Sequence, residues 1–198
     1  MNITIVQYNA GNIQSVLYAL ERLGVTASVT DDPAMIQAAD KVIFPGVGEA
    51  STAMAYLKER NLDQLIVSLK QPVLGICLGM QLMCKHSAEN DTKCLGIFEE
   101  QVMAFKATEN TTKVPQIGWN TITNLKTELF NGVPENSFVY FVHGYYAGLG
   151  DNTIATTDYI QAYSSGLHKN NFYGVQFHPE KSAELGEQII QNFLALKS

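Results

Sequence analysis

The first half of the chain alternates short apolar runs with stretches of helical periodicity, and this alternation restricts the fold more than any other feature of the sequence. Four apolar runs are typical of buried strands, at residues 3–6, 25–30, 41–44 and 72–76. Helix-like segments separate them, for example from Ile13 to Leu20 with apolar residues three and four apart. Because strands joined by helical crossovers pair in parallel, the pattern predicts an α/β fold with an open, mostly parallel sheet and helices on both faces.

The second half has a different character, with short β-rich segments separated by turn residues. These segments fall at residues 96–105, 121–124, 137–142, 153–157, 161–164 and 173–177. Their close spacing favours antiparallel strands added at one edge of the sheet. A final helix is expected over residues 183–196, and no linker or repeat divides the chain. We therefore expect a three-layer structure and a single domain over residues 1–198.

Composition narrows the functional classes. The 13 Lys and Arg residues are scattered and the formal net charge is −6, which does not favour binding to nucleic acid or to an anionic membrane. No apolar run approaches the length of a bilayer-spanning helix, and residues 1–8 look like a strand rather than a signal peptide. Three cysteines, an odd number, do not suggest a disulfide framework, and no residue cluster has the spacing of a metal site. We expect a cytoplasmic protein without a metal or other cofactor.

Cys77 stands in a glycine-bounded turn, residues 75–79 (Gly-Ile-Cys-Leu-Gly), between an apolar strand and a helical stretch. A nucleophile on so tight a turn needs small neighbours and lies at the positive end of the following helix, which favours the thiolate. The backbone N–H of Leu78 then donates to the oxyanion that forms during attack. A buried, inert cysteine at a strand end fits this segment equally well. Core packing is the better explanation for Cys84 and Cys94.

A histidine and an acid follow the last apolar run, in residues 174–180 (Gly-Val-Gln-Phe-His-Pro-Glu). Residues two apart on an extended chain face the same side, so Glu180 can reach one imidazole nitrogen of His178 while the other faces the sulfur. In that arrangement Glu180 fixes the tautomer, and His178 activates the thiol and protonates the leaving group. Taken alone, this segment is more often a surface turn. His143 lies in an aromatic run, where a hydrogen-bonded structural histidine is the first interpretation.

Residues 75–81 (Gly-Ile-Cys-Leu-Gly-Met-Gln) and 176–180 together resemble the class I, or triad-type, glutamine amidotransferases. The resemblance is closest to one branch of that family, the glutaminase subunits of imidazole glycerol phosphate synthase. Four further segments carry it, at residues 9–16, 44–48, 115–120 and 140–146. These motifs cover essentially the whole chain. They imply the fold of that family, hydrolysis of L-glutamine to L-glutamate and ammonia through a Cys77 thioester, and a role in histidine biosynthesis.

The resemblance also assigns residues. It implies Cys77 as nucleophile, His178 as general base and acid, and Glu180 as the residue that orients the histidine. It implies a second oxyanion donor, the N–H of Val47, whose flanking glycines ease rotation of its peptide groups. We hypothesise that this loop switches between donating and withholding that N–H, although a glycine turn before a helix accounts for the sequence nearly as well. The wall around the amino acid end of glutamine is expected from Gly48, Gln81, Glu89, His143, Gly144 and Tyr145.

Two residues depart from the family pattern, and neither touches the triad. Gly144 stands where serine is expected, which leaves only backbone groups to contact the substrate there. Gln116 replaces a frequent histidine on the side expected to face a partner. The resemblance suggests that Glu89 binds the ammonium group of the substrate. A solvent-exposed glutamate without such a role would have the same sequence context.

The chain lacks segments typical of an ammonia acceptor site, such as a phosphate-binding glycine loop or a second domain. The resemblance implies a heterodimer with a cyclase subunit of (β/α)8-barrel fold, which combines ammonia with a phosphorylated ribulosyl aminoimidazole carboxamide. Residues 115–120 and 9–15 are candidate interface segments, although burial of Trp119 in the core explains part of the first segment as well. Three alternatives stay open: a paralogous glutaminase for another acceptor such as a sugar, a noncatalytic binding subunit, and a peptidase-like hydrolase.

Overall fold

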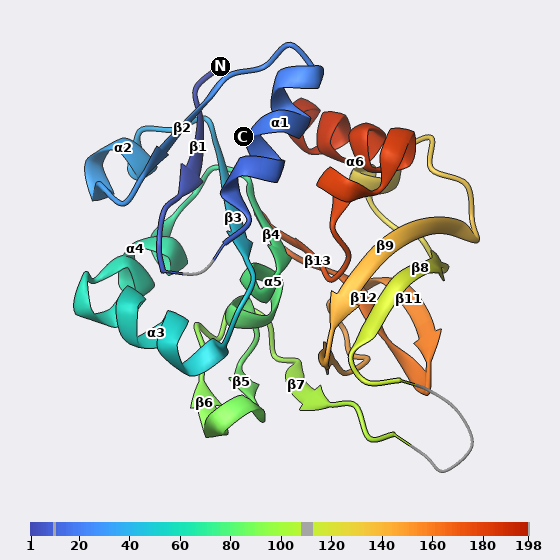
Figure 1. Cartoon of the computed structure of the whole chain (residues 1–198). Coiled ribbons are helices and arrows are strands. Elements are labelled where there is room, and N and C mark those ends of the chain that lie inside the picture. Colours follow the sequence, from blue (N-terminus) through green and yellow to red (C-terminus); the bar gives the residue numbers. More distant parts are fainter. Residues whose placement is uncertain (10, 108–112, 198) are drawn as a thin grey trace.

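The computed structural model describes residues 1–9, 11–107 and 113–197, and shows helices on both faces of one large sheet with a two-stranded ribbon beside it (Figure 1). The first half runs through β1 (Ile3–Val6), α1 (Ile13–Arg22), β2 (Ala27–Thr30), α2 (Pro33–Gln37), β3 (Lys41–Gly46), α3 (Ala50–Glu59), α4 (Leu62–Ser68), β4 (Val73–Cys77) and α5 (Leu78–Met83). The strands of the second half are β5 (His86–Ser87), β6 (Thr92–Lys93), β7 (Gln101–Ala104), β8 (Gln116–Ile122), β9 (Ser137–His143), β10 (Tyr145–Ala147), β11 (Thr153–Tyr159), β12 (Gln161–Lys169) and β13 (Phe172–Val175). Its helical segments are the 3₁₀ turns η1 (Glu89–Asp91), η2 (Glu128–Phe130) and η3 (Pro179–Lys181), and the helix α6 (Ala183–Ala195).

The central strands of the sheet are parallel. In the order β2-β1-β3-β4-β13 every neighbouring pair runs in the same direction. The sheet continues through β12-β10-β7-β5-β6, with antiparallel pairs except β7 with β5, and β11 pairs with β12. The predicted α/β fold is confirmed. In open sheets of this kind, sites form outside the carboxyl ends of the parallel strands.

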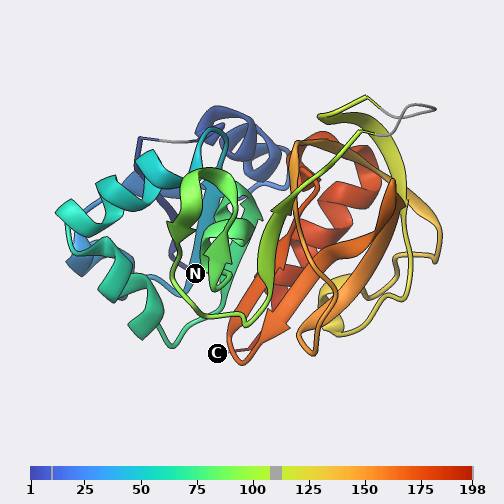
Figure 2. The same ribbon diagram turned by 90° about the horizontal axis from the view of Figure 1, so that it is seen from below.

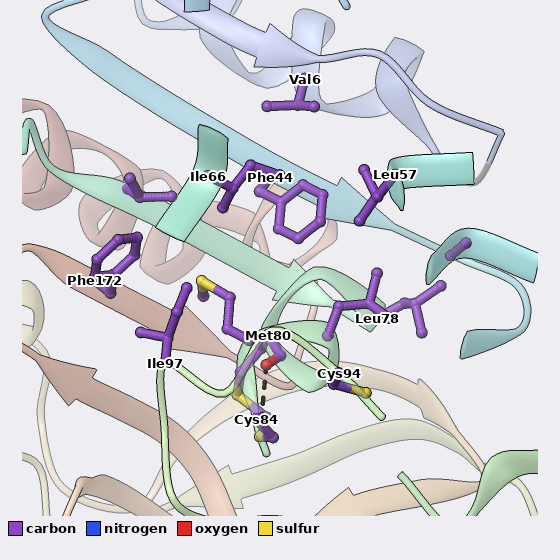
Figure 3. Close-up of a cluster of buried hydrophobic side chains, with 14 of the residues drawn as sticks. Val6, Phe44, Leu57, Ile66, Leu78, Met80, Cys84, Cys94, Ile97 and Phe172 are labelled. Atoms are coloured by element: carbon purple, nitrogen blue, oxygen red, sulfur yellow. Dashed lines mark hydrogen bonds between the residues drawn. The ribbon is translucent and has the colours of Figure 1, made fainter. Parts of the chain in front are cut away.

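Alternation of side chains along the parallel strands separates two apolar cores. In β3, Val42 and Phe44 belong to one core and Ile43 to the other. Figure 3 shows the first core, in which Phe44 of β3 and Leu57 of α3 lie close together. The second core contains Phe193 of α6 together with residues of α1. Seen from below, α3 and α4 (teal) accordingly lie well apart from α6 (red) (Figure 2).

The second half departs from the prediction in its strand pairing. The run at residues 173–177, expected as an added antiparallel strand, corresponds to β13, which lies in the middle of the sheet and pairs in parallel with β4. β8 and β9 form a separate antiparallel ribbon, with Gln116 opposite His143 and Ile122 opposite Ser137. Spacing along the chain does not show this, because strand pairing depends on contacts between segments far apart in sequence.

Several local expectations also need correction. β3 continues through Pro45 and Gly46, beyond the strand predicted over residues 41–44. The helix α4 and the short strands β5, β6 and β10 have no counterpart in the prediction. Trp119 is 53% exposed, so the alternative interpretation of residues 115–120, in which Trp119 is buried in the core, is wrong. Cys84 and Cys94 are buried as expected. None of the helices in the described ranges is long and apolar enough to cross a membrane.

Candidate active site

Cys77 lies at the carboxyl end of β4, where the chain turns sharply into α5. Its backbone has φ 54° and ψ −111°, a conformation that is costly for a residue with a side chain. Space requires glycine on either side: a Cβ at Gly75 would lie 2.8 Å from the Met80 nitrogen, and one at Gly79 would overlap the Phe44 carbonyl oxygen. The predicted need for small neighbours is confirmed, and the strained turn holds the sulfur at the end of the sheet.

His178 reaches the same edge because β13 lies beside β4, with Val175 paired to Ile76. Past the end of β13, the His178 N–H donates to the Tyr140 carbonyl of β9 at 2.9 Å. The Nδ1 atom lies 2.7 Å from Glu180 Oε1, and both side chains are 1% exposed. The predicted contact between this histidine and the acid two residues later is therefore present.

The thiol and the acid both act on the His178 imidazole. Burial by itself lowers the pKa of His178, but hydrogen bonding and charge from Cys77 and Glu180 raise it to about 10. The Nε2 atom has no hydrogen-bond partner of normal geometry in the described part of the chain, although the thiol is near enough to influence the ring. Cys77 is 6% exposed, with its sulfur 3.9 Å from the Val142 carbonyl. Thiol and imidazole can therefore exchange a proton, with Glu180 stabilising the imidazolium.

A cavity of about 440 Å³ opens over the sulfur. It is lined by Val47, Gly48, Cys77, Leu78, Gln81, Glu89, Pro115, Val142, His143, Gly144 and Tyr145. All residues that the sequence proposes as nucleophile, oxyanion donors and substrate wall thus share one cavity, whereas His178 and Glu180 are buried outside its lining. Pro115 and Val142 are added by the structure. The volume suits a ligand of amino acid size.

The glycine loop after β3 lies beside the nucleophile, because Gly46 pairs with Cys77 across β3 and β4. Gly48 has φ 119°, a backbone conformation that favours glycine. Val47 lies between these glycines, is 38% exposed and lines the cavity. Val47 and Cys77 therefore line the same cavity, as the oxyanion hypothesis requires.

Glu89 combines a structural contact with a place on the cavity wall. Its Oε2 accepts a hydrogen bond from the Ala50 N–H at 2.8 Å, at the start of α3. Burial raises the pKa of this carboxyl, and the Ala50 N–H opposes that shift. Because the side chain also lines the cavity, it can meet a cationic group there.

His143 is a hydrogen-bonded residue of the cavity wall. Its Nδ1 donates to the Tyr145 carbonyl at 2.7 Å, and its Nε2 lies 3.2 Å from the Tyr163 hydroxyl. Burial lowers the pKa of His143 to about 4, so the ring is neutral at pH 7. The Tyr163 hydroxyl also lies 3.0 Å from Gln116 Oε1. Gln116 is only 2% exposed, and it therefore supports the wall from inside instead of facing a partner.

Two further residues of the site are not singled out by the sequence. The Gln176 Nε2 atom lies 3.7 Å from the Cys77 sulfur, a contact that exists only because β13 lies beside β4. Tyr8 donates to the Pro45 carbonyl at 2.6 Å, at the base of the glycine loop. Gln176 belongs to a motif that sequence reasoning used, but Tyr8 carries no such signal. Among the described residues, no group of three or more His, Cys, Asp or Glu side chains could hold a metal ion.

Comparison with known families agrees with this geometry. Residues 4–196 match the family described as glutamine amidotransferase class-I. The chain belongs to the class I glutamine amidotransferases. This amidotransferase is 58% identical over 196 residues to the imidazole glycerol phosphate synthase subunit HisH of Bacteroides fragilis, covering 99% of this chain and 100% of the relative. The corresponding subunits of Bacteroides thetaiotaomicron and Yersinia pseudotuberculosis are 56% and 44% identical, with the same coverage. It therefore belongs to the HisH branch of the family, and the resemblance seen in its motifs is confirmed.

Solved structures show that the fold of this amidotransferase is shared by distant proteins. A putative GMP synthase subunit from Thermoplasma acidophilum matches with a TM-score of 0.75 at 21% identity, covering 98% of this chain and 92% of that chain. PurLQS from Thermotoga maritima matches with a TM-score of 0.67 at 18% identity, covering 98% and 97%. At these identities the likeness concerns the fold alone, and it agrees with the mostly parallel α/β sheet described above.

Proposed function

We propose that this amidotransferase is the glutaminase subunit of an imidazole glycerol phosphate synthase, hydrolysing L-glutamine and supplying ammonia to a cyclase in histidine biosynthesis. The observation that carries the proposal is the single cavity that gathers Cys77 with the oxyanion donors and the substrate wall, next to the buried His178–Glu180 pair. The 58% identity over nearly the whole chain supports the choice of pathway. In this proposal residues 1–198 act as one domain, in the cytoplasm and without a cofactor.

The first half-reaction forms a thioester. The Cys77 thiolate attacks the side-chain amide carbon of glutamine, and the N–H groups of Leu78 and Val47 stabilise the resulting oxyanion. The His178 imidazolium gives its proton to the amide nitrogen as the carbon–nitrogen bond breaks. Ammonia leaves, and a glutamyl thioester stays on Cys77. Glu180 keeps the imidazole in the tautomer and orientation that this transfer needs.

The second half-reaction releases glutamate. Neutral His178 takes a proton from water, whose oxygen attacks the thioester carbon, and the same N–H groups stabilise the second oxyanion. The carbon–sulfur bond then breaks, which regenerates the thiolate beside a protonated His178. In both steps the amino acid end of the substrate is held by Glu89, through its charge, and by the wall formed by Gln81 and Tyr145.

The partner is proposed to dock on the β8–β9 ribbon. Ile117, Trp119 and Phe138 are 64%, 53% and 57% exposed, and the strand register places all three on one face of the ribbon. A cluster of exposed apolar side chains is typical of an interaction surface. Val142 belongs to the same ribbon and lines the cavity, so a (β/α)8-barrel cyclase bound here would lie close to the released ammonia.

Reconstitution with the candidate cyclase tests the function. We expect glutamate release to rise when the cyclase and its phosphorylated acceptor are both present, and to fall by at least about 10⁴-fold in Cys77→Ala. If a sugar-aminating synthase stimulated glutamate release instead, the acceptor of the ammonia would be a sugar and not the proposed carboxamide. Absence of glutamate release with every synthase tested would reject the catalytic assignment. Comparing the Val47 peptide orientation in the free and the partner-bound, ligand-bound states tests the proposed switch in the glycine loop.

A further inference from the structure

The buried amide of Gln176 connects the nucleophile with the substrate wall. Its Nε2 atom lies 3.7 Å from the Cys77 sulfur, and its Oε1 accepts a hydrogen bond from Gln81 Nε2 at 2.8 Å. The same Gln81 amide donates to the Tyr145 carbonyl at 2.8 Å. Gln176 is 0% exposed and Gln81 is 5% exposed. These bonds therefore form out of contact with bulk water, where each of them counts for more.

One backbone carbonyl determines how both amides are oriented. The Tyr145 oxygen can only accept, so Gln81 must present its NH₂ group to it. The second hydrogen of that NH₂ group points to Gln176, which must therefore accept it with its side-chain oxygen. The NH₂ group of Gln176 is then left to face Cys77. The sulfur therefore receives a hydrogen-bond donor, and a donor favours the thiolate over the thiol.

We propose that Gln176 is a further functional residue of this site, donating from its side-chain amide to the Cys77 sulfur and holding Gln81 in the substrate wall through its amide oxygen. The proposal deepens the glutaminase function and rests on Cys77 as its nucleophile. A hydrogen bond to a charged acceptor is stronger than one to a neutral acceptor, so the bond strengthens when the thiolate forms. One side chain thus couples the reactivity of the sulfur to the position of the residue that contacts the substrate.

Other ionisable groups also face Cys77 or its cavity. They are Tyr8, Glu89, His143, Tyr145, Tyr163, His178 and, through the imidazole, Glu180. All of them stay in place in the variants proposed next. A difference between those variants therefore reports on the two amides and not on this background.

Gln176→Met removes both ends of the amide at similar volume. We expect the alkylation of Cys77 by iodoacetamide at pH 7, followed at the peptide level by mass spectrometry, to slow about 10-fold, and the midpoint of its pH profile to rise by about one unit. We expect kcat for glutamine hydrolysis to fall about 10- to 100-fold. Gln81→Met separates the two roles by degree, because Gln176 keeps its NH₂ group but loses the bond that orients it. It should raise KM, and it should shift the alkylation midpoint by less than Gln176→Met does.

Asn171→Leu is the matched control. The Asn171 amide donates to the Leu69 and Gln71 carbonyls at 3.0 and 2.8 Å, just before the opposite end of β13. Its loss costs a comparable pair of hydrogen bonds far from the sulfur. We expect a lower melting temperature with an unchanged alkylation midpoint. A shifted midpoint in this control would show that general loosening of β13 explains the result, and would overturn the role of Gln176.

The wild-type protein supplies a measurement that does not depend on any variant folding. The side-chain amide resonances of Gln176 should titrate with the same midpoint as Cys77 alkylation in a nitrogen-15 NMR experiment. Resonances insensitive to the state of the sulfur, or a wild-type midpoint in folded Gln176→Met, would overturn the proposal. Neither measurement needs glutamine. A chain that failed to hydrolyse glutamine would therefore count against the proposed function, while these results would still decide the role of Gln176.

Discussion

The active-site cavity lies between two parts of the molecule that are built differently. On one side, the parallel strands β3, β4 and β13 are buried along their whole length and place Cys77 and His178 next to each other. On the other side, the β8–β9 ribbon contributes Val142 and His143 to the wall and leaves an apolar face exposed. The comparison teaches that the proposed reactive groups lie on strands held by neighbours on both edges, or directly after such a strand. The ribbon part of the wall, in contrast, lies on an element with one free face. Rigid support suits the chemistry, and a free face suits a partner.

The largest contrast should come from replacing two buried carboxylates, one beside His178 and one in the antiparallel part of the sheet. Glu180→Gln keeps the shape of the side chain but cannot stabilise the His178 imidazolium, so we expect kcat to fall about 10²- to 10⁴-fold with KM nearly unchanged. The matched control is Glu100→Gln in the antiparallel part, where Glu100 is 6% exposed and accepts from Asn152 at 2.9 Å. Steady-state glutaminase kinetics of both variants check this. Equal losses of activity would mean that Glu180 acts through the stability of the fold and not through His178.

The second contrast concerns the space around Gly79, which follows the parallel strand β4 and Cys77. A Cβ at Gly79 would overlap the Phe44 carbonyl oxygen, and the backbone of β3 cannot move away without disturbing the sheet. We expect Gly79→Ala to lower the free energy of unfolding by about 3 kcal/mol or more. Urea denaturation followed by circular dichroism measures this. A loss below about 1 kcal/mol would show that the turn at Cys77 is less tightly packed than its geometry indicates.

The third contrast separates two roles of the exposed side chains on the β8–β9 ribbon, binding of the cyclase and stability of the fold. Trp119 is 53% exposed and packs edge-on against Tyr140, with ring centroids 6.0 Å apart. We expect Trp119→Ala to weaken binding of the barrel cyclase about 30-fold, and to change the free energy of unfolding by less than about 1 kcal/mol. Leu149→Ala, at a similarly exposed position outside the ribbon, should do neither. Calorimetric titration of the cyclase distinguishes the two variants, and equal affinities would remove the ribbon from the interface.

The smallest effect is expected at the glycine of the cavity wall. Among the described residues, a Cβ at Gly144 would meet the Pro115 Cβ at 3.8 Å and the Val114 Cγ1 at 4.0 Å, which is ordinary contact. We expect Gly144→Ser to change the free energy of unfolding by less than about 0.5 kcal/mol. The added hydroxyl should lower KM for glutamine about 2- to 5-fold, the value of a modest hydrogen bond. A raised KM would indicate that the hydroxyl blocks the substrate, and a large loss of stability would contradict the open packing.

The sequence predicted the parallel strands around Cys77 better than it predicted the β8–β9 ribbon. The strand β1 was expected at its observed bounds, and the turn at Cys77 was recognised from its glycines, because both are local patterns of period and size. In contrast, the sequence left burial of Trp119 in the core open as an alternative to an interface role, since an aromatic residue in a strand-like run has the same pattern on a buried and an exposed face. The buried support from Gln116 and Tyr163 to His143 was also missed, because its members lie on three different strands.

Local chemistry pointed to the candidate cysteine and to the histidine with its acid, because their motifs show a short-range pattern of glycine, nucleophile and base. The residues of the cavity wall came from the resemblance to the family. Long-range pairing alone brought them together. The insertion of β13 beside β4 joins residues about a hundred positions apart, and it aligns Gln176 with the sulfur. The order of strands in a sheet is set by burial and hydrogen bonding summed over the whole fold, and no short segment carries that information.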